Sequence, residues 1–354
     1  MAQFPQNPYT LVFGQPPLEF VNRMAQAERI ISDFCQERPS NYINLITGIR
    51  GSGKTVFLTQ VVNTIKKKDP NWIIVDLNPQ RDLLESLAAK LSSQQKLRRF
   101  FEEAEINLQA FGIGIGVKGI PPINDIEEAL SRMLQSLKKH RKRLLITIDE
   151  AGNSKNMRIF ASAFQIFLRN DLPVFLLMTG LYKSIDQLKN AEGMTFLERA
   201  PRTVLSPLNY DLIADKYENT LHLKPDQANR LAASTKGYAF AFQVIGYFCW
   251  ENKRNHKKAL EEAKAYLYEF AYAKIWSELS EKDKQIIVAV SRVPSGKILL
   301  IREMLHISTN QFNPYRNRLL KSGVVYSPAP GFLAFALPWF DEYAVHSSEL
   351  ENTF

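Results

Sequence analysis

The pattern of apolar and polar positions along the first 205 residues predicts strands and helices in turn. Apolar runs with the length of buried strands recur five times, at Tyr42 to Ile46, Trp72 to Leu77, Leu144 to Ile148, Val174 to Met178 and Thr203 to Leu205. Helical apolar spacing fills the stretches before and between them, at 20–36, 56–62, 82–91, 96–108, 125–137 and 159–168. This alternation predicts an α/β layer with a parallel sheet.

The pattern changes after residue 205. From Asn209 to about Tyr272 it indicates helices only, one of them opened by Pro225. From Ser280 onward, short helical segments are followed by extended runs interrupted by proline and glycine. We therefore expect three domains: 1–205, with an N-terminal arm at 1–20 laid on the core, then an all-helical domain at 206–275, and a C-terminal domain at 276–354.

Composition narrows the class of protein. The chain has 354 residues, of which 45% are hydrophobic and 23% charged, as in soluble globular proteins. Its net charge of +9 and its pI near 9.3 favour an acidic partner, nucleic acid first. The two cysteines are far apart and the five histidines scattered, which excludes a zinc cluster or a disulfide framework. With neither a signal peptide nor an apolar run of about 20 residues, we expect a cytoplasmic protein with no membrane contact.

The motif that carries the chemistry follows the first strand. It matches the G-x-x-x-x-G-K-[ST] phosphate-binding loop between a strand and a helix. Its residues, with the first of the helix, are Gly48, Ile49, Arg50, Gly51, Ser52, Gly53, Lys54, Thr55 and Val56. The glycines let backbone N–H groups turn toward an anion, and the helix N-terminus adds partial positive charge. Lys54 is placed for the β- and γ-phosphates and the Thr55 hydroxyl for Mg²⁺. The sequence predicts a nucleoside triphosphate site.

A second glycine pattern does not have this context. Gly114, Gly116 and Gly119 match G-x-G-x-x-G formally. Pro121 and Pro122 follow where a helix would have to begin. We interpret residues 111–120 as an extended pair or flap, not as a dinucleotide site.

Two carboxylates end the third strand. Asp149 is placed to hold Mg²⁺ beside Thr55, and Glu150 to orient and polarise the attacking water. Hydrolysis of a phosphoanhydride needs both roles, because its catalysis is mostly positioning and charge stabilisation. The Asp-Glu pair argues against kinases and simple GTPases, so ATP is the expected nucleotide.

Three further residues have two interpretations each, one functional and one purely structural. Thr179 ends the fourth strand, where it either senses the γ-phosphate or simply ends the strand. Arg199 and Arg202 precede the fifth strand, where one of them either reaches a neighbouring subunit's γ-phosphate or forms a surface salt bridge.

The segments GIRGSGKT, LLITIDE, LLMTG and RAPR, with helices behind them, resemble AAA+ ATPases of the origin-initiator and archaeal-type branch. The resemblance implies that the Thr179 strand separates the P-loop strand from the Asp149 strand. It also implies that Asn78 gates the catalytic glutamate and that Arg23 lines the adenine site. One departure is visible: where initiator-type lids have a sensor arginine, this chain has Gly237-Tyr238-Ala239-Phe240. Nucleotide-driven lid closure and the hydrolysis rate are therefore in question.

The resemblance and the element pattern together predict a C-terminal winged helix-turn-helix. Helices at 280–291, 299–306 and 308–321 are followed by two extended runs split by Pro328-Ala329-Pro330-Gly331. The third helix has side chains suited to base edges and phosphates, namely Asn310, Gln311, Asn313, Tyr315, Arg316, Arg318 and Lys321. Residues 292–321 contain six Lys or Arg and one Glu, a net charge of 6 − 1 = +5. This favours duplex DNA as the ligand, with a protein partner as the alternative.

Two functions follow from these features. The first is an ATP-hydrolysing switch, slow in turnover, that binds ATP, Mg²⁺ and double-stranded DNA and self-associates through an arginine finger. The second is a signalling ATPase of the STAND type whose C-terminal module binds a protein.

Overall fold

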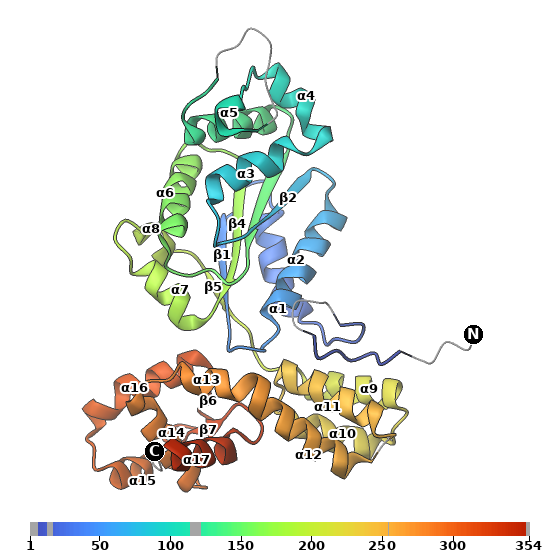
Figure 1. Cartoon of the computed structure of the whole chain (residues 1–354), viewed down its shortest axis with the longest axis vertical. Helices are drawn as coiled ribbons and strands as arrows, with labels where there is room; N and C mark the ends of the chain where they lie inside the picture. Colours follow the sequence, from blue (N-terminus) through green and yellow to red (C-terminus); the bar gives the residue numbers. More distant parts are fainter. Residues whose placement is uncertain (1–5, 13–16, 114–121, 254, 352–354) are drawn as a thin grey trace. The chain divides into compact units, whose positions relative to one another are not determined.

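The protein is described by a computed structural model, which covers residues 6–12, 17–113, 122–253 and 255–351 (Figure 1). The glycine pattern at 114–119 and residues 1–5 and 13–16 of the predicted arm lie outside these residues. The chain forms two compact units. We call residues 24–47 and 54–205 the sheet unit, and residues 1–23, 48–53 and 206–354 the helical unit.

The sheet unit contains five parallel strands in the order β2-β3-β4-β1-β5. Their bounds are β1 Ile43–Thr47, β2 Trp72–Leu77, β3 Arg143–Ile148, β4 Val174–Gly180 and β5 Arg202–Val204. The predicted parallel α/β sheet is confirmed. So is the order implied by the resemblance, because β4, which contains Thr179, lies between β1 and β3.

Helices cover both faces of this sheet (Figure 1). On β3, Leu144 and Ile146 pack with one cluster of helices and Leu145 with the other, because successive side chains point to opposite faces. One face carries α1 (Met24–Phe34) and α2 (Lys54–Lys68). The other carries α3 (Leu83–Ser92), α4 (Gln95–Glu103), α5 (Ile126–Lys139) and α6 (Lys155–Arg169). Strands buried on both sides explain why the sequence shows continuous apolar runs instead of alternation.

Some helix bounds differ from the expected ones. The first helix begins at Met24, not near Phe20, and α4 ends at Glu103, because Glu105 takes a left-handed backbone conformation (φ 55°). The sequence analysis missed three short elements, which bury few side chains and so leave little periodic signal: the 3₁₀ turn Gln109–Phe111, α7 (Tyr182–Lys189) and α8 (Thr195–Glu198).

The helical unit begins with the all-helical region that the sequence predicts. Its elements are α9 (Tyr210–Leu221), α10 (Pro225–Ser234), α11 (Ala239–Glu251), α12 (His256–Leu267), the π-turn Tyr268–Tyr272 and α13 (Ala273–Ser277). The described part of the N-terminal arm lies on these helices: Tyr9 is 2% exposed and packs edge-on to Phe242. Thr10 N–H donates to Gln243 Oε1 at 3.1 Å. The arm therefore packs with residues from beyond 205, although the sequence groups it with 21–205.

The last part of the chain has the elements expected there, in the expected order. Three helices come first, α14 (Glu281–Arg292), α15 (Ile298–Leu305) and α16 (Thr309–Ser322). An antiparallel pair follows, β6 (Val325–Tyr326) with β7 (Ala334–Phe335), and then α17 (Phe340–Glu351), which the sequence analysis missed. We call residues 280–351 the C-terminal module. Within the described ranges, no helix combines the length and apolar character needed to cross a bilayer.

Candidate functional site

The loop at residues 48–53 has a backbone that only glycine accommodates well. Gly51 and Gly53 have φ values of 75° and 87°, in the left-handed region that other L-residues rarely adopt. A Cβ atom on Gly51 would also overlap the phenol ring of Tyr238. The expected glycine roles in this loop therefore have a geometric basis.

Hydrogen bonds hold the loop from one side. Consecutive carbonyl oxygens accept from three donors of the helical unit: Arg50 O from Tyr238 Oη (2.8 Å), Gly51 O from Phe240 N (3.0 Å) and Ser52 O from Arg23 Nη2 (3.0 Å). In a trans peptide the next N–H points away from the carbonyl. The N–H groups of Gly51 and Gly53 consequently face away from these donors, on the side where an anion would bind.

Arg23 acts on the loop backbone. Besides Ser52 O, its guanidinium donates from Nε to Ser206 O at 3.1 Å. Burial lowers the pKa of Arg23 to about 10. The adenine-lining role implied by the resemblance stays a prediction, whereas these contacts give Arg23 a bracing role that the sequence did not reveal.

Tyr238 and Phe240 occupy the segment where initiator-type lids have a sensor arginine. Tyr238 is 5% exposed and Phe240 8%, and both bond to the loop as described above. Arg50 adds an ion pair to Glu278 at 3.1 Å. The sequence indicated only that the arginine is missing. No motif predicts a hydrogen bond from a tyrosine hydroxyl to a loop carbonyl.

The sheet unit supplies the next residues. Helix α2 begins at Lys54, so its partly positive N-terminus lies where the loop ends. Thr55 Oγ1 donates to Asp149 Oδ2 at 2.7 Å. The two side chains predicted to ligate Mg²⁺ are thus in direct contact.

Asp149 collects further hydrogen bonds at the end of β3. The Thr179 hydroxyl donates to Asp149 Oδ1, and the Glu150 backbone N–H donates to the same oxygen at 3.1 Å. Thr179 is fully buried, and its hydroxyl also accepts from Glu150 N at 3.3 Å. The structure therefore gives Thr179 a positioning contact to Asp149; its predicted contact to a γ-phosphate stays a prediction.

The backbone turns sharply at Glu150, two residues after the end of β3. Its φ is 55°, a left-handed conformation that is uncommon for a non-glycine residue and clusters at functional sites. Its side chain is exposed. An exposed carboxylate directly after Asp149 has the access to water that a hydrolytic base needs. We call Thr55, Asp149, Glu150 and Thr179 the Asp149 corner.

Asn78 lies on the neighbouring strand end. Leu77 pairs with Ile148, so Asn78 and Asp149 follow at the same level of β2 and β3. Asn78 Oδ1 accepts from Gln80 N at 2.9 Å, which closes a tight turn after the strand. The gating role of Asn78 stays a prediction.

The two candidate finger arginines differ in how they are held. Arg202 pairs with Asp186 at 3.5 Å and lies over the Tyr182 ring at 4.4 Å. Arg199 is exposed at the end of α8. The salt-bridge alternative therefore describes Arg202, and Arg199 is the better placed of the two to reach another molecule.

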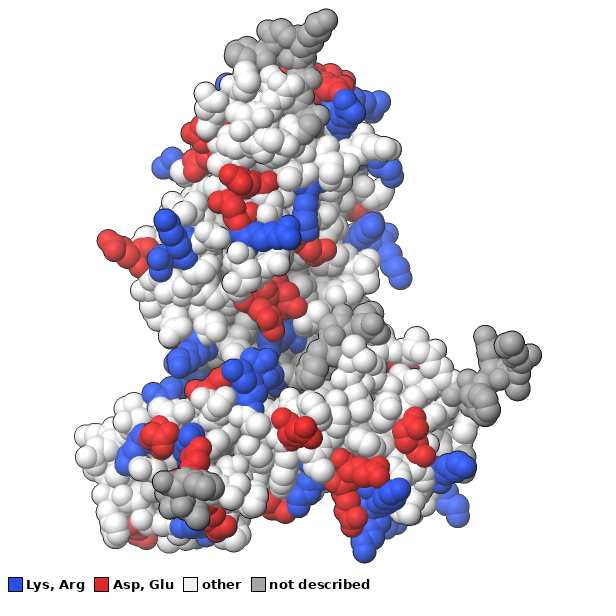
Figure 2. Space-filling view, viewed as in Figure 1, with Lys and Arg blue, Asp and Glu red and all other residues white. Residues whose placement is uncertain are grey.

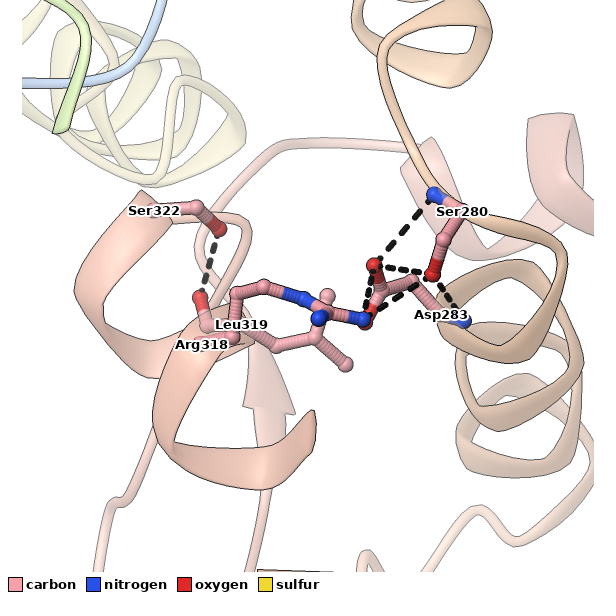
Figure 3. A network of polar contacts seen from close by, with 5 residues as sticks. All are labelled: Ser280, Asp283, Arg318, Leu319 and Ser322. Atoms are coloured by element: carbon pink, nitrogen blue, oxygen red, sulfur yellow. Dashed lines mark hydrogen bonds and ion pairs between the residues drawn. The ribbon is translucent and has the colours of Figure 1, made fainter. Parts of the chain in front are cut away.

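Several of the seven predicted DNA-contacting side chains have partners within the protein. Arg318 donates to both carboxylate oxygens of Asp283, from Nε at 3.1 Å and Nη2 at 2.7 Å (Figure 3). It also lies over the Tyr315 ring. Gln311 Oε1 accepts from Ser308 N at 2.9 Å in a capping box. Asn310, Asn313 and Lys321 of this set are exposed, and Arg316 is half-buried.

The chemistry of the donor set fits a magnesium nucleotide. Hydroxyl and carboxylate oxygens are the ligands that Mg²⁺ prefers, with phosphate oxygens completing its shell. The Ser52 hydroxyl, 7% exposed, has no hydrogen-bond partner among the described residues, as expected for a loop built to meet a ligand. Among the described residues, no group of three or more His, Cys, Asp or Glu side chains is placed to hold a metal ion.

Comparisons with known protein families match two parts of the chain. Residues 20–171 match the family "ATPase domain predominantly from Archaea", and residues 269–344 match a "Domain of unknown function (DUF8462)". A search of curated proteins gives no match.

Solved structures share the fold along nearly the whole chain. The Walker-type ATPase PABY2304 of Pyrococcus abyssi is 16% identical with a TM-score of 0.64, over 92% of this chain and 96% of that one. The Aeropyrum pernix ORC2 protein, solved as ADPNP-ADP complexes, is 15% identical with a TM-score of 0.59, over 97% and 98%. Residues 20–171 thus match the archaeal-type ATPase family, and the chain is an ATPase with the AAA+ fold.

Proposed function

We propose that this ATPase is a slow, Mg²⁺-dependent switch whose nucleotide state controls binding of duplex DNA by the C-terminal module. The observation that carries the nucleotide part is the contact of Thr55 Oγ1 with Asp149 Oδ2 at 2.7 Å, directly after a glycine loop with its N–H groups turned to one side. Two ligand groups already in contact need only a small rearrangement to share a cation.

The residues divide the work as follows. Backbone N–H groups of the loop and Lys54 bind the phosphates, and Thr55 with Asp149 would hold Mg²⁺. When bound, this ion neutralises charge on the phosphate oxygens. Thr179 and the Glu150 N–H fix the orientation of Asp149. Glu150 is the group placed to accept a proton from the attacking water.

DNA binding is proposed from the charge of the C-terminal module and the order of its elements. Three helices and a hairpin are the elements of a winged helix, in which the third helix enters the major groove. On α16, Asn310, Asn313 and Lys321 are exposed. They are the residues we propose for base and phosphate contacts, with Arg316 beside them.

The test is ATP turnover by the purified protein, with and without duplex DNA. We expect slow basal turnover that DNA stimulates. Lys54→Ala should abolish nucleotide binding, because the loop loses its phosphate-binding cation. Glu150→Gln should retain ATP binding and lower turnover by about a hundredfold or more, because a base is lost while the shape is kept.

Glu192→Gln is the matched control for Glu150→Gln, because Glu192 is an exposed carboxylate of the same unit, between α7 and α8. It should leave turnover unchanged. Turnover that survives in Glu150→Gln would refute the role of Glu150. DNA that neither binds nor stimulates would refute the DNA part alone.

A second function is favoured by an apolar surface on the C-terminal module. Leu299, Leu300 and Met304 of α15 are 59%, 42% and 45% exposed. Exposed apolar side chains grouped on one short helix are typical of protein contacts. If nucleotide-dependent partner capture is lost in Leu299→Glu while DNA binding is absent in the wild type, the module binds a protein.

Self-association through an arginine finger is proposed for Arg199. Its exposure leaves it able to reach a neighbouring copy, whereas Arg202 is paired within its own unit. Turnover per molecule should then rise with protein concentration in the wild type and not in Arg199→Ala. Turnover independent of concentration would contradict this.

A further inference from the structure

The sheet unit contains a second candidate binding region, a cleft of about 950 Å³ at the edge strand β2. Trp72 and Ile74 lie on the face covered by α2, and Ile73 on the face covered by α4. Side chains from both faces line the cleft, together with the end of α2 and the start of α4. The cleft therefore straddles the edge of the sheet, near the N-terminal end of β2, whereas the Asp149 corner lies at the C-terminal ends of the strands.

The backbone of β2 is open toward this cleft. Arg143 N–H donates to Asn71 O at 3.2 Å, so residue 71 faces β3. Because residues alternate along a strand, 73, 75 and 77 face β3 as well, and 72, 74 and 76 face away from it. Lys90 Nζ bonds Asp76 O from that outer side, which agrees with this alternation. The N–H and C=O groups of Ile74 are thus directed to the outer edge, where no strand lies among the described residues.

The charge of the cleft has one sign. Its lining includes Lys66, Lys96, Arg99 and Lys142, and no Asp or Glu. None of these four cations forms an ion pair with a carboxylate in the described part of the chain. In Figure 2, blue side chains are spaced along the margin of the sheet unit where Figure 1 draws α4 and α2. Four cations without a carboxylate among them are an electrostatic match for an acidic ligand.

A buried donor adds a polar contact point. Trp72 is 5% exposed, and its indole N–H has no hydrogen-bond partner among the described residues. Buried polar groups are nearly always hydrogen-bonded, so an unpartnered donor lining a cleft marks a place for an acceptor from a ligand.

We propose that this cleft binds an extended acidic peptide segment of another protein, which adds to the sheet as a strand beside β2. A peptide has both N–H and C=O groups, so it can pair with the outer edge at Ile74, while its carboxylates meet the cations. The sugar-phosphate backbone of DNA has no donors for the outward carbonyl groups of residues 72 and 74, and RNA has only its 2′-hydroxyls, which is why a peptide fits better. Apolar side chains of the peptide would contact Trp72 on one face and Phe100 on the other.

The test uses an acetylated, amidated peptide of about eight residues in which Glu alternates with Val, the length of an ordinary strand. Binding is measured by fluorescence anisotropy with the full chain. Lys96→Glu should weaken binding about fivefold, because it reverses one of the four charges. Lys67→Glu is the matched control: it makes the same change of net charge on an exposed residue that does not line the cleft, and should have little effect.

A second peptide tests strand pairing without changing the protein. It has the same sequence with its central amides N-methylated, so that neither of its edges can donate hydrogen bonds. We expect it to bind about tenfold more weakly. Lys54→Ala should bind the first peptide as the wild type does, which separates this proposal from the nucleotide site.

Three results would overturn the proposal. One is no binding of the first peptide to the wild type. Another is equal binding of the methylated peptide, which would show that charge alone acts. The last is a single-stranded oligonucleotide of equal charge that binds as tightly and loses as much affinity in Lys96→Glu, which would make the cleft a nucleic-acid surface.

Discussion

The Asp149 corner and helix α16 are both rich in polar side chains, but the fold employs those side chains differently. At the corner, two threonine hydroxyls and a backbone N–H converge on one carboxylate, and all three donors are neutral. On α16, Arg318 turns to the Asp283 carboxylate on α14 and balances its charge (Figure 3). Neutral donors orient an anion and leave its charge available for a cation, whereas an arginine consumes it.

This difference separates a site from a structural brace. The Asp149 corner was predicted from motifs with fixed spacing, namely the glycine loop before a helix and the Asp-Glu pair at the end of a strand. The α16 residues were found by composition, since Asn, Gln and Arg suit nucleic acid in general. Residue type alone does not say whether an arginine faces a ligand or its own protein.

The largest expected effect comes from removing the charge at the corner. Asp149→Asn keeps the shape and one of the two acceptor oxygens, while its amide nitrogen can only donate to the other threonine hydroxyl. It loses the negative charge that would hold Mg²⁺. We expect turnover to fall by about a hundred- to a thousandfold, with the thermal midpoint nearly unchanged.

Asp171→Asn is the control for Asp149→Asn. Asp171 is an exposed carboxylate in the same unit, paired with Lys138 at 2.6 Å. Its substitution should leave turnover intact. Equal turnover in wild type and Asp149→Asn would show that the corner is structural.

The next effect is on stability in the C-terminal module. Arg318→Ala leaves the Asp283 carboxylate, 5% exposed, without its cation. Because the Arg318 side chain is about half exposed, we expect the free energy of unfolding to fall by about 1–2 kcal/mol, less than for a fully buried pair. Urea unfolding measures this.

Asn313→Ala completes that comparison, because Asn313 is exposed on the same helix. It should change stability by less than about 0.5 kcal/mol and weaken DNA binding instead. The assignment of Arg318 as a brace fails if Arg318→Ala unfolds at the wild-type urea concentration yet no longer binds DNA.

A smaller effect distinguishes two buried strand-end threonines. Thr179 donates to Asp149, whereas the Thr47 hydroxyl has no partner among the described residues. Thr179→Val should lower turnover about tenfold, because Asp149 loses a positioning hydrogen bond. Thr47→Val should instead raise the free energy of unfolding by about 1 kcal/mol, because an unpaired hydroxyl is removed. Similar outcomes for the two variants would contradict this distinction.

The smallest effect concerns the contact of Tyr238 with the loop. Tyr238→Phe removes only the hydroxyl that bonds Arg50 O, and we expect ATP affinity to fall about three- to fivefold. Tyr217→Phe is matched, since its buried hydroxyl donates to Phe242 O at 2.8 Å, away from the loop. Tyr217→Phe should lower the free energy of unfolding, because a buried hydrogen bond is lost, and leave ATP affinity unchanged. Calorimetric titration can check the affinity.

The sheet was predictable because its central strands β1, β3 and β4 are buried on both faces and so appear as nearly uninterrupted apolar runs. The Thr55 and Asp149 contact was predictable because both positions follow strands that lie close in a parallel sheet. The contacts that hold the phosphate loop could not be predicted. Arg23, Tyr238 and Glu278 bond the loop from 25 or more positions away in the sequence, and no local pattern records such contacts. Helix α17 was missed because only Phe340 and Ala344 are buried on it, too few to make a periodic stripe.

The three hydrogen-bonded carbonyls of the phosphate loop limit how far this ATPase can be divided. Residues 48–53 group with the helical unit, although the strand before them and the helix after them group with the sheet unit. A fragment comprising 1–205, the domain that the sequence predicts, would contain every residue of the motif and Arg23, yet it would lack Tyr238 and Phe240, which bond two of these carbonyls. The unit that holds the loop in shape is thus larger than the domain predicted from sequence, and the motif moved into another protein would keep its residues but lose these two hydrogen bonds.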